Sequence, residues 1–510
     1  MPVNLVGHII DIVSMRSNQT AFIFLADGEV EKDRLTYFDL DLKARALAAE
    51  LQKHAKAGDR ILLSYLPGID FIIAFIGCLY AGMIAVPAYP LRNNRHAKRL
   101  LVMLNDCEPR LVLGTADSLS IMQAQPEFSV YHYILTDSIA DEMAYSYRAP
   151  IITSDMLAFL QYTSGSTGLP KGVMVSHENI VANMQALEGV FSIGTNAKIV
   201  SWLPMQHDMG LVGQMLYSLY MGATEIIMSP AAFLEKPSRW LRAISHYQGF
   251  MCGGPNFGYQ LCIEKITEQE THGLDLSCWK AAFNGSEPVR ATTLQDFSKK
   301  FTGCNFNFQA FLPCYGMAET TLIISGKPRA EMPIISAVKQ TALVTGHLVK
   351  DEQSNYLLVS SGQVYASYVV KIVNPDTQKL AEPNEIGEVW VRGPSVAQGY
   401  WNKPEATQEI FRATLQNDPH KYLRTGDLGY LDGPELYITG RLKDIIILQG
   451  RNVYPQDVEQ AVEECHSALR IGHTAAFAVE VNEQEQLVIV AEVERTYRKI
   501  ELKPVFRAIR

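Results

Sequence analysis

The sequence predicts an α/β protein: a large N-terminal domain of layered α/β subdomains plus a β subdomain, followed by a small α+β C-terminal domain. Apolar, β-branched segments alternate with helical stretches from about residue 20 to about residue 330, which is typical of largely parallel sheets covered by helices. After Thr341, short alternating runs are divided by Pro, Asn, Asp and Gly, which favours antiparallel strands. The 510 residues also exceed the size at which a single core keeps growing.

The N-terminal domain is predicted to cover residues 1–441, with its β subdomain at about 341–441. The C-terminal domain is predicted to cover residues 442–510, because the chain there returns to a mixture of strand-like and helix-like segments. In order, these segments are a strand at Asp444–Leu448, a Pro-started helix at Pro455–Glu464, and strands at 474–481 and 487–493.

A run of eighteen uncharged residues, Phe71–Ala88, has the length of a candidate membrane span. Gly77 and Gly82 interrupt this run, and the segment Arg60–Leu66 before it has the composition of a strand. A strand, a buried helix and a second strand at Met83–Pro87 would form a βαβ unit. We therefore predict that the run lies inside the α/β domain and that the chain has no transmembrane segment.

The composition is that of an ordinary globular protein, with 47% hydrophobic and 19% charged residues. Lys and Arg total 45 against 54 Asp and Glu, and no block of like charge occurs, which argues against a nucleic-acid-binding protein. The eight cysteines are scattered without a C-x-x-C pair, so zinc and dithiol redox sites are not indicated. Since Met1–Arg16 carries no secretory signal, we expect a reducing, cytoplasmic setting.

The segment Tyr162–Gly172, YTSGSTGLPKG, combines three glycines, several hydroxyl groups and one lysine. Glycines let backbone N–H groups converge on an anion, and hydroxyl groups and a lysine add donors and positive charge. Apolar runs on both sides indicate that the loop joins two strands, and its spacing is not that of a Walker A loop. A flexible Ser/Gly turn is the alternative. The candidate phosphate-binding residues are Thr163, Ser164, Gly165, Ser166, Thr167, Gly168 and Lys171.

This loop resembles the signature of the adenylate-forming (acyl-activating) superfamily, which contains acyl-CoA synthetases, nonribosomal-peptide adenylation domains, fatty acyl-AMP ligases and firefly luciferase. Four further motifs of that family follow in the expected order, and the resemblance covers nearly the whole chain. It implies an ATP-dependent ligase that uses ATP and Mg²⁺ to convert a carboxylic acid into an acyl adenylate and pyrophosphate. Lys171, Mg²⁺ and the loop N–H groups would lower the barrier to bringing two anions together.

The segment Cys314–Thr320, CYGMAET, resembles the family motif in which a tyrosine stacks on adenine and a glutamate helps to hold Mg²⁺. The resemblance implies these roles for Tyr315 and Glu319, since an aromatic face suits a purine and a carboxylate suits Mg²⁺. Ala318 stands where the family commonly has a phosphate-contacting threonine, so one of the two threonines after Glu319 is expected to supply that hydroxyl group. The implied nucleotide-binding residues of this segment are Tyr315, Gly316, Met317 and Thr320.

Two more motifs match the parts of the family site that hold the nucleoside. Asn284–Pro288, NGSEP, resembles the adenine-side loop, and Arg424–Asp427, RTGD, supplies an aspartate that accepts both ribose hydroxyls in the family. Arg441, in GRLKD, would donate to the ribose or to a phosphate. Each segment alone is an ordinary turn, so the prediction rests on their joint order. The implied nucleotide-binding residues are Gly285, Ser286, Glu287, Pro288, Asp427 and Arg441.

The family places a hinge near the start of the C-terminal domain, about which this domain turns between two reaction steps. The resemblance puts the hinge at Lys443, and an ordinary exposed lysine is the alternative. The family also carries a late lysine in a Gly-Lys segment, and no such motif follows Val453. We therefore expect an incomplete C-terminal domain and, for the chain as it stands, slow adenylation.

Three segments favour the fatty acyl-AMP ligases within the superfamily. They are Ser201–Leu211, SWLPMQHDMGL, the NGSEP form of the adenine-side loop, and about 343–365, where those ligases carry an insertion. The resemblance implies a fatty acid substrate and transfer of the acyl group to an acyl carrier protein or to a carrier domain of a polyketide or nonribosomal peptide synthase. The candidate acyl-binding residues are His207, Asp208, Met209, Pro255 and Phe257, and His207 is also a catalytic candidate for orienting the carboxylate.

Several alternatives remain open from the sequence. A long-chain fatty acyl-CoA synthetase has the same fold and first step but a different acceptor. A luciferase-like oxygenase and a non-catalytic nucleotide-binding regulator are more remote. The insertion could also be a β-hairpin without functional consequence. The segment Gly253–Leu261, which contains Pro255 and Phe257, could line a narrow apolar tunnel for the acyl chain or could equally be part of the packed core.

Overall fold

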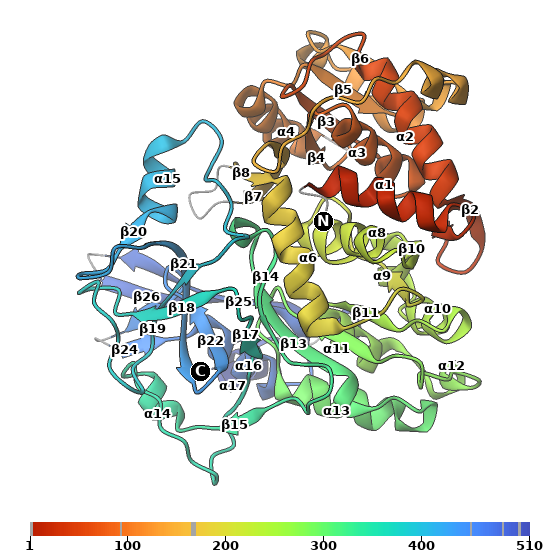
Figure 1. Cartoon of the computed structure of the whole chain (residues 1–510). Coiled ribbons are helices and arrows are strands. Elements are labelled where there is room, and N and C mark those ends of the chain that lie inside the picture. The colour runs from red at the N-terminus through yellow and green to blue at the C-terminus, as the bar shows by residue number, and fades with distance from the viewer. Residues whose placement is uncertain are drawn as a thin grey trace.

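The computed structural model describes residues 4–91, 94–164, 170–448, 451–481, 484–497 and 501–509. Two large sheets and the helices packed on them make up the molecule, which confirms the predicted α/β class. In Figure 1 the orange strands of the smaller sheet (β3–β6) lie at one end, its yellow strands β7 and β8 lie nearer the centre, and the cyan and blue antiparallel strands lie at the other end. Helix α6 (His177–Phe191) runs between these two ends (Figure 1).

The larger sheet has fourteen strands, and one half of it is parallel, as predicted. The strand order in this half is β13–β12–β11–β9–β10–β1, and the antiparallel strand β2 pairs with β1 at the edge. The strands are β1 (Thr20–Leu25), β2 (Glu31–Thr36), β9 (Lys198–Ser201), β10 (Thr224–Met228), β11 (Met251–Gly254), β12 (Ala281–Asn284) and β13 (Phe311–Gly316).

The predicted β subdomain is not a separate sheet, because β13 also pairs with the antiparallel strand β14 and the ladder continues from there. The motif Cys314–Thr320 therefore begins where the parallel and antiparallel halves meet. The strands of the second half are β14 (Ile323–Gly326), β17 (Gln363–Val364), β18 (Val369–Val373), β19 (Gly387–Arg392), β20 (Ala413–Thr414), β21 (Lys421–Asp432) and β22 (Glu435–Arg441).

The smaller sheet has six strands in the order β6–β5–β3–β4–β7–β8. The predicted βαβ unit is confirmed: β3 and β4 pair in parallel, and the buried helix α3 (Ile69–Tyr80) connects them. Within the described ranges, no helix is both long enough and apolar enough to span a bilayer. The strands are β3 (Arg60–Ser64), β4 (Ile84–Ala88), β5 (Leu111–Gly114), β6 (Tyr133–Leu135), β7 (Leu157–Ser164) and β8 (Pro170–Ser176).

Helix α6 begins directly after β8 and ties the two sheets together. Ser176 starts the helix with a capping box, in which its side chain and that of Asn179 each accept the backbone N–H of the other residue. One turn later the buried side chain of Asn183 donates to the carbonyl oxygens of Thr320 and Ile323, over 3.2 and 3.0 Å. The helix that follows the phosphate-loop hairpin therefore also fixes the turn that contains Glu319.

The other helices cover the sheets and bury an extensive aromatic core around Trp240, Tyr259 and Trp279. They are α1 (Leu5–Arg16), α2 (Tyr37–Leu51), α4 (Asn94–Cys107), α5 (Ala116–Gln123), α7 (Asp208–Gly210), α8 (Tyr217–Met221), α9 (Pro230–Glu235), α10 (Ser238–Tyr247), α11 (Asn256–Lys265), α12 (Glu268–Thr271), α13 (Ala291–Phe301), α14 (Gln340–Leu343) and α15 (Pro404–Phe411).

The C-terminal segment has the strand–helix–hairpin order expected from the sequence, and the predicted boundary at residue 441 falls on the last residue of β22. Its first hairpin and helix pack on the β subdomain: Tyr454 is buried beside Tyr430 and Tyr437. Tyr356 of the predicted insertion donates to Asp457 over 2.7 Å. The insertion region contributes the strand pair β15 (Ile335–Ala337) and β16 (Leu357–Val359). The C-terminal segment comprises β23 (Ile446–Leu448), β24 (Arg451–Val453), α16 (Pro455–Cys465), β25 (Leu469–Val481), β26 (Gln484–Val493) and α17 (Lys503–Ile509).

Candidate active site

Strands β7 and β8 form the antiparallel hairpin that carries the predicted phosphate loop, which confirms that the loop joins two strands. Thr163 pairs with Lys171 and Ser164 with Pro170, so the ladder extends to the base of the loop. Lys171 is therefore fixed by a backbone ladder where the loop rejoins the sheet. Four of the predicted phosphate-binding residues lie outside the described ranges: Gly165, Ser166, Thr167 and Gly168.

Glu319 lies in a short 3₁₀ turn directly after β13, and only 7% of it is exposed. Its Oε1 atom accepts the hydroxyl group of Tyr400 over 2.7 Å. Burial raises the pKa of Glu319 against the effect of this hydrogen bond, and the charges of Asp208 and Asp427 raise the pKa further. The charges of two carboxylates from distant segments therefore act on Glu319.

The predicted adenine and ribose residues meet directly. Tyr315 donates from its hydroxyl group to Asp427 Oδ2 over 2.6 Å, and Arg441 Nε lies 3.2 Å from Asp427 Oδ1. Burial raises the pKa of Asp427, while Tyr315 and Arg441 oppose this rise. Asp427 is 7% exposed, and its two oxygens are held by one donor each, which leaves lone pairs for further acceptance. The Asp427 carboxylate is therefore suited to accept hydrogen bonds from the two hydroxyl groups of a ribose.

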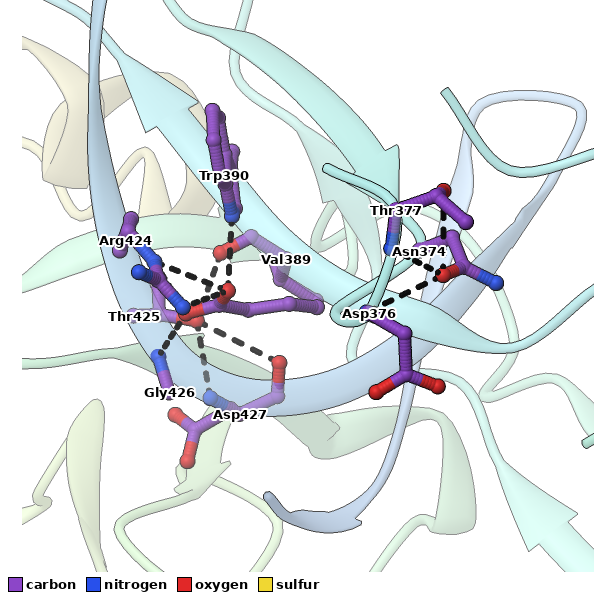
Figure 2. Close-up of polar contacts among 10 residues, drawn as sticks. Asn374, Asp376, Thr377, Val389, Trp390, Arg424, Thr425, Gly426 and Asp427 are labelled. Carbon is purple, nitrogen blue, oxygen red and sulfur yellow. Dashed lines mark hydrogen bonds and ion pairs between the residues drawn. The ribbon is translucent and has the colours of Figure 1, made fainter. Parts of the chain in front are cut away.

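A buried carboxylate that the sequence analysis missed supports the segment Arg424–Asp427. Glu388, 2% exposed, pairs with the Arg424 guanidinium over 2.9 Å and accepts the Gly426 N–H over 3.2 Å. Figure 2 shows the neighbouring contacts, in which the Thr425 hydroxyl donates to the Val389 carbonyl over 2.7 Å and accepts the N–H of Asp427 over 3.0 Å. Strand β19 therefore holds the backbone that presents Asp427.

Figure 2 also shows one further hydrogen bond to this network and one turn beside it. Trp390 Nε1 donates toward the Glu388 carboxylate over 2.9 Å, so a buried aromatic donor adds to the ion pair. In the loop after β18, Asn374 Oδ1 accepts the N–H groups of Asp376 and Thr377 and closes a turn. The first contact fixes the carboxylate itself, and the second only shapes the adjacent loop.

Replacing Glu388 with glutamine is expected to destabilise the protein by about 3 kcal/mol and to raise the KM for ATP, because the Arg424 charge and the Gly426 N–H lose a buried anionic acceptor. Denaturant unfolding measures the first effect, and initial rates at varied ATP measure the second. Glu385→Gln is the matched control, since Glu385 accepts a side-chain hydrogen bond from Asn374 away from the site. A destabilised Glu388→Gln protein with an unchanged KM would reduce Glu388 to a purely structural residue.

The adenine-side loop is fixed between the nucleotide strand and helix α11. Ser286 occupies the left-handed region of backbone conformation, with φ 69°. A Cβ atom at Gly285 would stand 2.8 Å from the carbonyl oxygen of Cys314, so only glycine allows this approach of β12 to β13. Glu287 Oε1 accepts the backbone N–H of Phe257 over 2.5 Å. The predicted adenine loop and the predicted acyl segment are therefore in direct contact.

His207 caps the short helix α7 and pairs with its neighbour, since its Nδ1 lies 2.7 Å from Asp208 Oδ1. Burial lowers the pKa of His207, but the charge and hydrogen bond of Asp208 outweigh burial and raise this pKa above its ordinary value. Asp208 also accepts the Met209 N–H over 2.8 Å, so it holds both the imidazole and the start of the helix. An imidazole held in this position suits a role in orienting a substrate carboxylate, which stays a prediction.

A narrow cavity of about 40 Å³ opens beside Tyr315 and the adenine-side loop. Its walls come from α6, the π-helical turn Leu211–Leu216, β11, β12 and β13. Met209 lines the cavity, whereas Phe257 is 42% exposed and its ring centre lies 5.7 Å from that of Trp202; contact of either residue with an acyl chain stays a prediction. The lining residues are Leu187, Phe191, Met209, Gly213, Met251, Phe283, Gly285, Ser286, Cys314, Tyr315, Gly316, Leu322 and Ile323.

The threonines after Glu319 close the turn that presents this carboxylate. Thr320 is fully buried, and its hydroxyl group lies 2.9 Å from the carbonyl oxygen of Met317. The Thr321 hydroxyl donates to the Ser395 carbonyl over 2.8 Å. A phosphate contact from either residue requires the side chain to rotate away from these partners, so this role stays a prediction. The hinge role of Lys443 also stays a prediction, although the residue is exposed in the turn between β22 and β23.

Sequence reasoning missed Tyr400, Glu388 and Asn183, each of which contacts a residue of one of the predicted motifs. Glu388 shares a strand face with Trp390 and Arg392, a pattern that indicates a solvent-facing side of a strand. Tyr400 stands in an ordinary Gly-Tyr-Trp-Asn stretch. Neither position carries a local signal, because its role depends on partners far away in the sequence.

Comparison with known proteins agrees with the nucleotide-binding site that this geometry indicates. The AMP-binding enzyme family model matches residues 12–401. The chain is 41% identical to the medium-chain-fatty-acid–[acyl-carrier-protein] ligase JamA of Moorena producens, over 96% of this chain and 86% of that protein. It is 33% identical to the long-chain-fatty-acid–AMP ligase FadD32 of Mycolicibacterium smegmatis, over 99% of this chain and 88% of that protein.

Among solved structures, a fatty acyl-adenylate ligase from Legionella pneumophila, in complex with acyl adenylate and pyrophosphate, superposes with a TM-score of 0.85. It is 40% identical in sequence, and the match covers all of this chain and 90% of that one. The family model covers well over half of the chain, and both relatives are matched over most of their length. The chain belongs to the AMP-binding enzyme family.

Proposed function

We propose that the chain is a fatty acyl-AMP ligase, which condenses a fatty acid with ATP to an acyl adenylate and pyrophosphate and passes the acyl group to a carrier protein. The observation that carries this proposal is that Tyr315, which lines an apolar cavity, donates a hydrogen bond to Asp427, whose charge in turn influences Glu319. Tyr315 therefore connects the predicted nucleotide-binding residues to an apolar cavity. A site built in this way suits an ATP molecule and an acid with an apolar tail.

In the first step a carboxylate oxygen of the acid attacks the α-phosphorus of ATP. A bond forms between these atoms, and the bond from the α-phosphorus to the bridging oxygen breaks, so pyrophosphate leaves with the electron pair. The acid is ionised at neutral pH and needs no general base. Lys171 would stabilise charge on the α-phosphate oxygens, His207 would orient the carboxylate, and Asp427 would hold the ribose hydroxyls.

The Glu319 side chain has the chemistry and the position expected of a ligand to Mg²⁺. Among the described residues, no three or more His, Cys, Asp or Glu side chains are grouped so that they could hold a metal ion by themselves. Mg²⁺ is commonly held by one or two carboxylates together with substrate phosphates, and a single buried glutamate beside the nucleotide residues matches that pattern. When bound, Mg²⁺ neutralises charge on the phosphate oxygens.

The second step is a transfer to the thiol of a carrier-bound phosphopantetheine, which attacks the acyl carbonyl carbon as AMP leaves. Support for a carrier protein as acceptor comes from the relative JamA, a medium-chain-fatty-acid–[acyl-carrier-protein] ligase. Further support comes from the insertion at about 343–365, where Tyr356 holds Asp457 of α16 and thereby ties the C-terminal segment to the β subdomain. Such a tie would disfavour the domain rotation that a different acceptor, coenzyme A, requires in related enzymes.

The two acceptors are separated by product analysis. With ATP, Mg²⁺ and dodecanoate, we expect acyl adenylate, an acyl thioester when a carrier protein bearing phosphopantetheine is added, and no more acyl-CoA than an enzyme-free control when coenzyme A is added. Mass spectrometry identifies each product, and a mixed fatty-acid pool reports the preferred chain length. Efficient acyl-CoA formation would replace the proposal with a long-chain acyl-CoA synthetase. Failure to release pyrophosphate with any fatty acid would exclude both enzymes.

The proposal includes a cytoplasmic setting. All eight cysteines are unpaired thiols, and burial raises the pKa of Cys78, Cys252 and Cys262, which keeps these thiols protonated and unreactive. Cell fractionation tests this setting, and recovery of the protein outside the cytoplasmic fraction would contradict it.

A further inference from the structure

Tyr400 lies between two residues that the proposed reaction needs. Its hydroxyl group donates to Glu319 Oε1 over 2.7 Å, and the Lys171 Nζ atom lies 4.9 Å from the centre of its ring. The residue is 7% exposed, so both contacts are made in a largely desolvated place, where charge-assisted and cation–π interactions are strongest. One side chain therefore contacts both the phosphate-loop lysine and the predicted metal ligand, which are 148 residues apart in the sequence.

The backbone around Tyr400 is fixed to the same two motifs. The segment 397–401 runs antiparallel to β8: Trp401 N–H donates to the Gly172 carbonyl over 2.8 Å, and Met174 N–H donates to the Gly399 carbonyl over 2.9 Å. At its other end, Ala397 N–H donates to the carbonyl oxygen of Glu319 over 2.9 Å. The segment thus adds one more strand-like partner to the edge of the smaller sheet and also holds the 3₁₀ turn.

Two further contacts set the position of the tyrosine along this segment. Thr407 of α15 accepts the Tyr400 N–H over 2.9 Å, and Gly399 allows that approach, because a Cβ atom there would stand 2.4 Å from the Thr407 methyl carbon. Lys403 donates to Asp106 Oδ1 over 2.7 Å, and Tyr162 of β7 donates to Asp106 Oδ2 over the same distance. The hairpin that carries the phosphate loop and the Tyr400 segment are therefore anchored to one carboxylate.

We infer that Tyr400 is a positioning residue for adenylation: its hydroxyl group orients the Glu319 carboxylate for the metal, and its ring seats the Lys171 ammonium group. This inference rests on the proposed function and assigns a separate task to each half of one side chain. A hydrogen bond from outside the ligand set commonly sets a ligand's orientation, and its loss typically costs about 10- to 100-fold in metal affinity. The ring contact holds a flexible lysine in one place before substrate arrives.

The two tasks are separated by two substitutions. Tyr400→Phe removes only the hydroxyl group, so we expect the Mg²⁺ concentration for half-maximal pyrophosphate release to rise about 10-fold, with kcat at saturating Mg²⁺ close to that of the unchanged protein. Tyr400→Leu also removes the ring, so we expect the same Mg²⁺ effect and, in addition, a kcat about 10-fold lower at saturating Mg²⁺. Tyr400→Met replaces Tyr400→Leu if the latter fails to fold.

Tyr422→Phe is the matched control, because Tyr422 is also a buried tyrosine whose hydroxyl group donates to a carboxylate, Asp418, over 2.7 Å. We expect this variant to leave the Mg²⁺ requirement unchanged. Calorimetric titration of each protein with ATP, with and without Mg²⁺, gives a readout that does not depend on turnover. Tyr400→Phe should bind ATP alone normally and gain less affinity from Mg²⁺.

Two results would overturn the inference: an unchanged Mg²⁺ requirement in Tyr400→Phe, or identical kinetics in Tyr400→Phe and Tyr400→Leu. The first removes the task of the hydroxyl group, and the second removes the task of the ring. If the unchanged protein releases no pyrophosphate with any carboxylic acid, the proposed function fails. The calorimetric comparison of ATP and Mg²⁺ binding still decides whether Tyr400 positions the metal ligand.

Discussion

Replacing Lys171 with alanine is expected to lower the rate of acyl-adenylate formation about 1,000-fold, with a much smaller change in the KM for ATP. Two anions must meet at the α-phosphorus, and the charge on its oxygens grows as the carboxylate attacks. A preorganised ammonium group acts mainly on that developing charge, so its removal affects kcat more than ground-state binding. The β7–β8 ladder and the Tyr400 ring hold this lysine in place before the reaction begins.

Single-turnover formation of acyl adenylate, measured by quenching and mass spectrometry, tests this expectation without interference from product release. Lys198→Ala is the control, because Lys198 is an exposed lysine at the start of β9 and lies outside the site. Lys171→Arg keeps the charge on a longer, planar group and should fall between the two. If Lys171→Ala retains the unchanged rate, Lys171 has no part in the chemical step, and the proposed mechanism loses its main electrostatic element.

Replacing Asp427 with alanine is expected to raise the KM for ATP about 100-fold, the second-largest effect predicted for the site. Two hydrogen bonds from the ribose hydroxyls to an ionised acceptor would be lost. The substitution also leaves the Tyr315 hydroxyl and the Arg441 guanidinium without their carboxylate partner. Asp427→Asn keeps the shape of the side chain, and with it the fold, and should show most of the same loss.

The role of Asp427 is isolated by changing the nucleotide as well as the protein. The unchanged enzyme should use 2′-deoxy-ATP and 3′-deoxy-ATP markedly less well than ATP, whereas Asp427→Asn should discriminate little among the three. Asp432→Asn is the control: Asp432 lies on the same strand and pairs with the exposed Lys350. Full discrimination in Asp427→Asn would mean that another group reads the ribose.

The sequence by itself determined the order of the elements and the chemistry of the motifs. The alternation of apolar runs with Gly and Pro predicted the βαβ unit around Phe71–Ala88, because burial and turn formation are decided by neighbouring residues. The apolar runs on both sides of Tyr162–Gly172 predicted a loop between two strands for the same reason. The motifs around Tyr315 and Asp427 each resembled part of one site, although no local property placed them together.

Only the tertiary structure decided which of these groups meet and what holds them. Tyr315 and Asp427 are 112 residues apart and share a hydrogen bond because β13 and the antiparallel strands belong to one continuous sheet. Glu388 and Tyr400 support the site from positions whose sequence context is that of ordinary surface strands and turns. Local sequence sets backbone propensity and polarity, whereas a buried hydrogen bond depends on the register of distant strands, and this register exists only in the folded chain.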